Sequence, residues 1–350
     1  ALSLGLPALL LNSGLAHADD DAIMLDTMQV EERTLDTNPY AEPGAPYKAK
    51  TSGDSRHVKD LAETPQTITV LTQTQIQESG RSDLKDILDA QPGITLGTGE
   101  NGNAFGDRYV IRGHEARSDV FVDGLRDPGM TTRESFAVEQ VEITKGPSST
   151  FAGRGSTGGA VNSITKQAST EYNFNKAEGG IGTDDYRRIT LDSNAGLSDS
   201  VAVRANVLHS FEQVPDREEN TRERNGLALS GLWSATDKLD LIADYYHLSA
   251  FDQVDLGSFI NRETGFVYED IPSYVQQQDF VKSRVDTLTL RAKYRVNDTV
   301  RLENALRYGT TNNGYVVTGA RGTTTDASDP NGEYSTISLS THQGWQEVDV

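Results

Sequence analysis

The second half of the chain alternates apolar and polar residues with a period of two. Stretches 201–207, 288–296 and 300–308 each place apolar residues on one face and polar or charged residues on the other. Because side chains of a β-strand point alternately to opposite faces, this pattern predicts strands rather than helices. We expect eight strands, at residues 172–181, 186–197, 201–211, 224–235, 239–249, 285–296, 300–310 and 334–350.

The connections between these strands distinguish two kinds of β-protein. From "SDS" onward, short turns alternate with long connections at residues 212–223, 250–284 and 311–333. Short turns at one end and long loops at the other are typical of transmembrane β-barrels, whereas a soluble sandwich has no reason to sort its loops in this way. The pattern therefore favours part of an antiparallel transmembrane barrel over residues 168–350.

Residues 57–167 have a different pattern, in which short strands alternate with helices. "TITVLT" (67–72) is typical of a strand, and "RYVIRG", "SDVFVDG" and "VEQVEITKG" predict three more. "SDLKDILDAQPG" (82–93) predicts a helix, with Ser82 as N-cap and an apolar face of Leu84, Ile87 and Leu88. We expect a compact α+β domain here.

A glycine-rich stretch, "AGRGSTGGA" (152–160), raises the alternative of a nucleotide site. Its G-x-G-x-x-G spacing matches a dinucleotide-binding turn, which requires a strand before it and a helix after it. A strand does precede the stretch, but the β-branched residues in "AVNSITK" (160–166) predict a second strand rather than a helix. We therefore expect the glycines to serve backbone geometry and not phosphate binding.

Composition excludes several other functions. Lys+Arg 32 against Asp+Glu 52 gives a net charge of −20, which argues against a broad nucleic-acid-binding surface. The chain has no cysteine, and its six histidines lack the spacing of zinc ligands. The paired acids Asp119/Asp123 and Asp184/Asp185 are typical of turns, and "DASDPNGE" (326–333) has a proline where a calcium loop needs a ligand. We expect neither a catalytic group nor a directly bound metal.

The N-terminus predicts export. Residues 1–18 are apolar and end in Ala-His-Ala, which resembles the end of a secretory signal peptide. Residues 19–56 lack periodicity and predict a flexible arm, in which "LDTMQVEE" (25–32) is the one ordered-looking segment. An exported all-β adhesin, or an outer-membrane protein that acts on polysaccharide, is the alternative class that these features leave open.

Several phrases in order resemble one family, the TonB-dependent siderophore receptors, over residues 65–166. They are "ETPQTITVLT", "DILDAQPGI", "YVIRG", "VFVDGLRD" and "VEQVEITKGPSSTFAGRGSTGGAVNSITK". The sequence from Asp119 to Lys166 most resembles the catecholate branch of the family. The resemblance implies an α+β plug domain inside a transmembrane β-barrel of 22 strands. It implies that the chain is the N-terminal part of such a receptor, in the outer membrane of a Gram-negative bacterium.

The resemblance also implies partners and contact residues. A TonB box is expected at Asp26, Thr27, Met28, Gln29 and Val30, where a short extended segment can add to a sheet edge of TonB, which works with the inner-membrane ExbB-ExbD complex. Buried charges must be paired. The charged residues expected at the contact between plug and barrel are Arg112, Glu139, Glu142 and Lys145.

The expected ligand is a ferric siderophore, most simply a catecholate, which carries its own iron, so no cofactor is expected. Such a complex is a multiply charged anion with flat rings, and it needs cations and planar partners. The loops near 99–108 and 125–135 would face the outside in the resembled plug. The candidate ligand residues in them are Asn103, Phe105, Arg108, Arg126, Met130 and Arg133. Outer-membrane lipid is the remaining expected partner, and nucleic acid is not expected.

Overall fold

The computed structural model describes residues 38–42, 44–97, 108–116, 119–127, 131–147, 156–215, 217, 220–254, 256, 265, 273–325 and 334–349. All of them belong to one compact unit, Thr34–Val350. This unit contains an α+β domain and one large antiparallel sheet.

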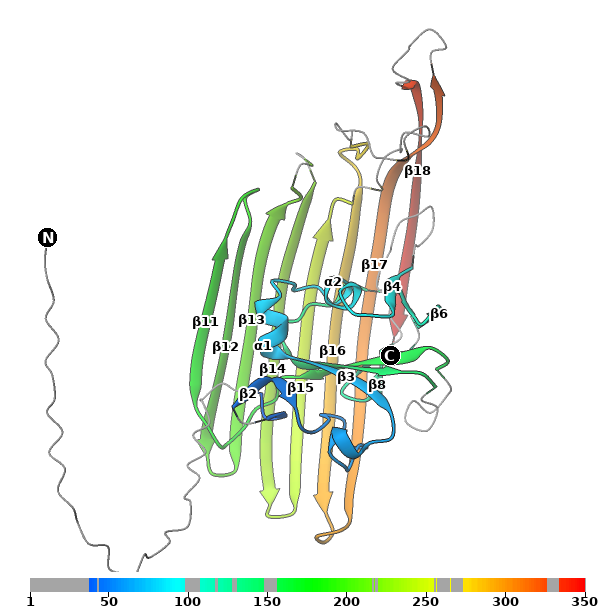
Figure 1. Cartoon of the computed structure of the whole chain (residues 1–350). Helices are drawn as coiled ribbons and strands as arrows, with labels where there is room; N and C mark the ends of the chain where they lie inside the picture. The colour runs from blue at the N-terminus through cyan, green and yellow to red at the C-terminus, as the bar shows by residue number, and fades with distance from the viewer. Residues whose placement is uncertain are drawn as a thin grey trace, which may run out of the picture. The chain divides into compact units, whose positions relative to one another are not determined.

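The large sheet has eight strands that neighbour one another in chain order, from β11 to β18 (Figure 1). Their bounds are β11 Phe174–Ile181, β12 Arg187–Ser198, β13 Val201–Gln213, β14 Thr221–Thr236, β15 Leu239–Asp252, β16 Phe280–Arg295, β17 Arg301–Thr325 and β18 Tyr334–Asp349. Each pairs antiparallel with the next. The alternation read from the sequence therefore located all eight strands of the sheet.

Strands β16 and β17 extend furthest beyond the predicted bounds. β16 begins at Phe280 rather than 285, and β17 continues to Thr325, through about two thirds of the connection expected at 311–333. The ladder between them pairs Phe280 with Val316, and β18 continues pairing as far as Thr325. Pairing to a neighbouring strand stabilises an extended backbone here, although Gly309, Gly314 and Gly319 weaken the local strand propensity.

The two faces of the large sheet differ in the way that a barrel wall requires. One face exposes apolar side chains, including Leu288, Leu290 and Tyr294. The other buries polar and charged ones, including Arg204 and Arg291, against the α+β domain. Among the described residues, no helix has the length and apolar character needed to cross a membrane.

The α+β domain is built on a five-stranded sheet with the order β3-β9-β10-β7-β8. The strands are β3 Thr67–Thr72, β7 Val120–Val122, β8 Leu125–Arg126, β9 Val138–Lys145 and β10 Gly159–Thr165, and a second sheet joins β4 Ile94–Leu96, β5 Tyr109–Ile111 and β6 His114–Glu115. Helix α1 (Gln73–Glu78) packs against β3 and β9, and helix α2 (Leu84–Asp89) packs against β4. The 3-10 helix η1 (Leu61–Glu63) precedes β3. The domain's core includes Leu88, Tyr109, Ile111, Val120 and Ile143, each fully buried.

The N-terminus of helix α2 differs from the prediction. α2 does bury Leu84, Ile87 and Leu88, but its N-cap is Asp83 rather than Ser82, with the Asp83 carboxylate accepting from Lys85 N at 2.8 Å. An aspartate is as good a cap as a serine and its charge favours the helix N-terminus. The helix also ends at Asp89, four residues before the end of the predicted segment 82–93.

The expected flexible arm ends earlier than residue 56. Residues 38–56, which we call the N-terminal strap, include β1 (Ala41–Glu42) and β2 (Ala45–Ala49) and lie against the α+β domain. Asn38 is 6% exposed and donates to Glu139 O at 2.9 Å and to Gln140 Oε1 at 3.0 Å. The strap is held mainly by polar contacts, which hydrophobic periodicity does not register.

The described part of the glycine-rich stretch confirms a backbone role. A Cβ on Gly158 would lie 2.1 Å from the carbonyl oxygen of Ile111, and one on Gly159 would lie 2.2 Å from that of Thr144. Gly159 also has φ +149°, which side chains rarely adopt. The segment that follows is strand β10, so the helix that a dinucleotide site needs is replaced by a strand.

Candidate functional site

Buried ion pairs join the α+β domain to the inner face of the large sheet, and those between described residues form three groups. In the first, Glu139 of β9 contacts Arg204 of β13 through Oε1 and Nη1 at 2.7 Å, with both side chains almost fully buried. Arg204 also binds Asp192 of β12 through two bonds, at 2.9 and 2.8 Å. Lys166 adds a contact to Asp192 at 2.9 Å. Two cations and two anions are thus buried together, as a low-dielectric site requires.

The second group centres on Arg291 of β16, which bridges the two domains. Its guanidinium contacts Asp123 of the α+β domain at 2.5 Å and Asp244 of β15. Asp123 sits in the β7–β8 turn with φ 50°, where it also accepts from the backbone N–H and the hydroxyl of Thr165 at 2.8 and 2.7 Å. The turn therefore directs the Asp123 carboxylate toward the inner face of the large sheet.

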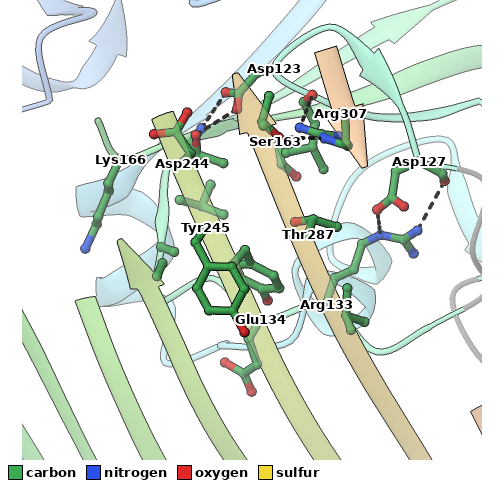
Figure 2. Close-up of a pocket in the computed structure, with 18 of the residues that line it drawn as sticks. Asp123, Asp127, Arg133, Glu134, Ser163, Lys166, Asp244, Tyr245, Thr287 and Arg307 are labelled. Carbon is green, nitrogen blue, oxygen red and sulfur yellow. Dashed lines mark hydrogen bonds and ion pairs between the residues drawn. The ribbon is translucent and has the colours of Figure 1, made fainter. Parts of the chain in front are cut away.

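A cavity of about 100 Å³ lies beside this second group, between the two domains (Figure 2). Arg307 reaches it from β17, donating to Thr289 Oγ1 at 3.0 Å and to Val122 O at 3.3 Å. Thr131 lines it with a fully buried hydroxyl that has no hydrogen-bond partner in the described part of the chain. Apolar as well as charged side chains line the cavity. An apolar cluster also joins the domains, in which Phe136 and Ala137 of the α+β domain pack with Leu208, Leu248 and Val285 of the large sheet. The contact between the domains is therefore both ionic and apolar.

The third group surrounds Glu134, which is 5% exposed. It contacts Arg188 of β12 at 3.0 Å and Arg224 of β14 at 3.7 Å. Burial raises the pKa of the Glu134 carboxyl above its ordinary value, and the two guanidinium groups oppose that rise. Arg224 is balanced further by Asp252 and by Asp83, the latter at 3.8 Å.

Only part of the predicted contact set reaches the large sheet. Glu139 does so, whereas Glu142 binds inside the α+β domain and its strap. Its carboxylate accepts from Ser52 Oγ and Gly53 N, both at 2.6 Å, and from Gln140 at 2.7 Å. Among the described residues, the hydrogen-bond partners of the Glu142 carboxylate are thus in the strap and on β9, and its contact to the barrel stays a prediction.

For the other two predicted contact residues, the structure gives backbone pairing within the α+β domain. Arg112 has φ 51° and donates its backbone N–H to Gly93 O at 2.8 Å. Lys145 pairs with Thr67 and Gly159 along the sheet. Sequence reasoning missed Asp123 and Glu134 as contacts, although a carboxylate in a "VDG" turn beside a predicted barrel offered a signal for Asp123.

Three of the six candidate ligand residues are described. Arg108 pairs with Glu115 at 3.0 Å and is about one third exposed. Arg126 lies 5.4 Å from the centre of the Phe121 ring and 3.6 Å from Asp119, and its side chain is 25% exposed. Asn103, Phe105 and Met130 lie outside the described residues, as do the TonB box residues Asp26, Thr27, Met28, Gln29 and Val30.

Arg133 does not have the setting expected of a ligand residue. Its side chain is 10% exposed, and its Nε binds Asp127 Oδ2 at 2.9 Å. It also donates to the carbonyl oxygens of Thr131 and Asp127. These contacts support the shape of the Arg133 loop, and a role for Arg133 in ligand binding stays a prediction.

Comparison with known proteins identifies relatives for this arrangement. Residues 60–160 match the TonB-dependent Receptor Plug Domain. The chain is 34% identical over 285 residues to the probable TonB-dependent siderophore receptor PiuA of Acinetobacter baumannii, covering 77% of this chain and 38% of that protein. It is 29% identical over 319 residues to the catecholate siderophore receptor Fiu of Escherichia coli K12, covering 86% of this chain and 42% of that protein.

Solved structures give the same result for the fold. The closed-form crystal structure of the ferric-catecholate import receptor Fiu from E. coli K12 matches with a TM-score of 0.76 and 27% identity, over 90% of this chain and 45% of that one. The crystal structure of PiuA matches with a TM-score of 0.71 and 33% identity, over 78% and 40%. The chain thus spans less than half the length of these relatives.

Proposed function

Because the chain belongs to the TonB-dependent siderophore receptors, we propose that this protein is an outer-membrane receptor that binds a ferric siderophore and imports it with energy transduced by TonB. Besides family membership, the contact between the two domains supports the proposal. The α+β domain is fastened to the inner face of the large sheet by buried ion pairs, led by Glu139 with Arg204. A domain held in this way would close a barrel at rest, and a force that breaks its ion pairs and separates the small apolar cluster around Phe136 would release it.

The proposed activity is transport rather than catalysis. The relatives are receptors, and the glycine-rich stretch that could have held a nucleotide instead shapes the turn into β10. Energy would come from the inner-membrane proton gradient through ExbB-ExbD and TonB, which would pair with Asp26–Val30 of the arm. Iron is cargo, carried by the siderophore, so the protein needs no cofactor of its own.

A catecholate is the siderophore class that we propose. Fiu is a catecholate receptor by name, and this chain keeps a cation beside an aromatic ring at Arg126 and Phe121. Arg126 Nη2 makes no hydrogen bond within the described residues, and its partner Asp119 is 3.6 Å away. An anionic ligand that reaches Arg126 would meet a guanidinium with an unused donor. Arg108, Asn103, Phe105 and Met130 are the accompanying candidates.

The test is uptake and binding by the receptor expressed from its complete gene, in cells that lack other catecholate receptors. Arg126→Glu should weaken binding of a ferric catechol complex at least tenfold, while Arg81→Glu, an exposed substitution elsewhere in the domain, should leave it unchanged. Normal catecholate uptake by Arg126→Glu would remove that residue from the site. Growth of the wild type on ferric hydroxamate alone would overturn the catecholate assignment and leave the receptor assignment intact.

A further inference from the structure

The outward face of β16 changes from apolar to charged before the strand ends. Leu288, Leu290 and Tyr294 are exposed on it, and then come Asp286, Arg284 and Lys282 at the same alternate positions. An apolar band about 25 Å tall, crossed by strands tilted about 40°, takes about ten residues at about 3.3 Å each. Counted from Tyr294 near the short-turn end, ten residues place the upper boundary of the band at Arg284.

An aromatic cluster surrounds Lys282 just beyond that boundary. The Lys282 ammonium lies 5.2 Å from the centre of the Phe280 ring and 4.7 Å from that of Trp345 on β18. Between them on β17 is Gly314, where a Cβ would lie 2.3 Å from the Trp345 ring. The absence of a side chain at Gly314 therefore allows the indole to lie across β17 toward the lysine. Trp345 remains 65% exposed.

The two cations in this region keep donors for an external anion. Asp286, the carboxylate on the same row, accepts from His247 at 2.7 Å, from the Tyr245 hydroxyl at 2.9 Å and from Arg284 Nε at 3.3 Å. With its carboxylate shared among three partners, Asp286 leaves the outer nitrogens of Arg284 uncommitted within the described residues. The Arg284 side chain is 67% exposed.

The strands on either side add no opposing charge at this level. Arg284 is paired with Ser249 and Asn312, and Lys282 with Phe251 and Gly314, all of them uncharged. Among the described residues, the carboxylates that follow on this level, Glu223 and Glu347, are two strands away, at about 10 Å. Two cations and a wide aromatic face thus lie together on the outer wall.

We propose that Lys282, Arg284, Phe280 and Trp345 form a binding site on the outer wall for the headgroup of a phosphorylated glycolipid. The cations match phosphate and the aromatic faces match sugar rings, at the height where the hydrocarbon band gives way to headgroups. The inference rests on the proposed function in one respect, the location in the outer membrane. It assigns a lipid site that is separate from the siderophore path inside the barrel.

Native mass spectrometry of the complete receptor in detergent, with bisphosphorylated lipid A as the probe, tests this site. The variant Lys282→Gln/Arg284→Gln should lower the lipid-bound fraction at least fivefold. Lys293→Gln/Arg295→Gln, which removes the same two kinds of charge at the short-turn end of the same strand and on its other face, should leave it at the wild-type level. The exchange Lys282→Arg/Arg284→Lys, which keeps both charges, should also bind as the wild type does.

Equal lipid retention in the Lys282→Gln/Arg284→Gln variant and the wild type would overturn the site, and so would loss of binding in the charge-keeping exchange. Wild-type binding of phosphatidylglycerol as tight as that of lipid A would overturn the glycolipid assignment. Ferric catecholate binding is measured on the same preparations. Normal siderophore binding with no lipid preference would remove only the lipid site, whereas absent siderophore binding by the wild type would count against the proposed function.

Discussion

Removing the Glu139 carboxylate is expected to loosen the plug from the barrel wall by an amount that the structure sets. Glu139 and Arg204 are 4% and 3% exposed, and breaking a buried pair by deleting one partner costs about 3–5 kcal/mol. Here Arg204 keeps both of its bonds to Asp192, so its charge is not left alone. We therefore expect Glu139→Ala to cost about 2 kcal/mol, close to one hydrogen bond to a charged group.

Hydrogen exchange measured by mass spectrometry can check this value in the complete receptor. Since about 1.4 kcal/mol corresponds to tenfold, about 2 kcal/mol should speed exchange of the β9 and β10 amides about 30-fold. Glu63→Ala, at an exposed position of the same domain, is the control and should leave those rates unchanged. Unchanged exchange in Glu139→Ala, or equal acceleration in Glu63→Ala, would refute the idea that this pair fastens the plug.

Three further outcomes are expected. Burial raises the pKa of Glu142, so its contribution to stability is full below the ordinary glutamate pKa of about 4.3 and is lost as the pH rises through the raised value. The variant Glu142→Gln should therefore show a smaller fall in plug Tm between pH 4 and pH 7 than the wild type. An identical fall in the two proteins would contradict this. Gly158→Ala forces a Cβ against a backbone oxygen and should lower the free energy of unfolding, measured by calorimetry, by at least about 1–3 kcal/mol. Gly179→Ala, with open space around it, should lower this free energy little. Equal losses of stability in the two variants would contradict the packing argument. Met28→Pro should abolish iron uptake while siderophore affinity is retained, and unchanged uptake would place the TonB box elsewhere.

The strands of the large sheet could be predicted from the sequence because each one separates two environments. A strand that faces lipid on one side and a polar interior on the other must alternate, and the alternation in 201–207 and 300–308 shows this directly. The ends of strands were harder to predict. β17 continues to Thr325 because β18 pairs with it. The local composition of a segment does not indicate which other segment will pair with it.

The charged contacts could be predicted only in part for a related reason. Burial demands a partner for Glu139 and Glu142 alike, but the sequence does not say which partner is near. Glu139 pairs with Arg204 of the large sheet, whereas Glu142 accepts hydrogen bonds from Ser52 and Gly53 of the strap, which the sequence predicted to be flexible. The strap's polar contacts leave no periodic trace, so both its order and its effect on Glu142 become visible only in three dimensions.

The position of β9 also has a mechanical consequence. On one side, Asn38 of the strap holds Glu139 O and Gln140 Oε1 by two neutral hydrogen bonds, and on the other, the Glu139 carboxylate holds Arg204 of the wall. These links are in series, so tension applied ahead of Asn38 passes through the neutral bonds before it reaches the charged one. Charge-assisted bonds are roughly twice as strong as neutral ones. The strap is therefore the first element to yield under load, and it peels from β9 while the plug is still anchored to the wall.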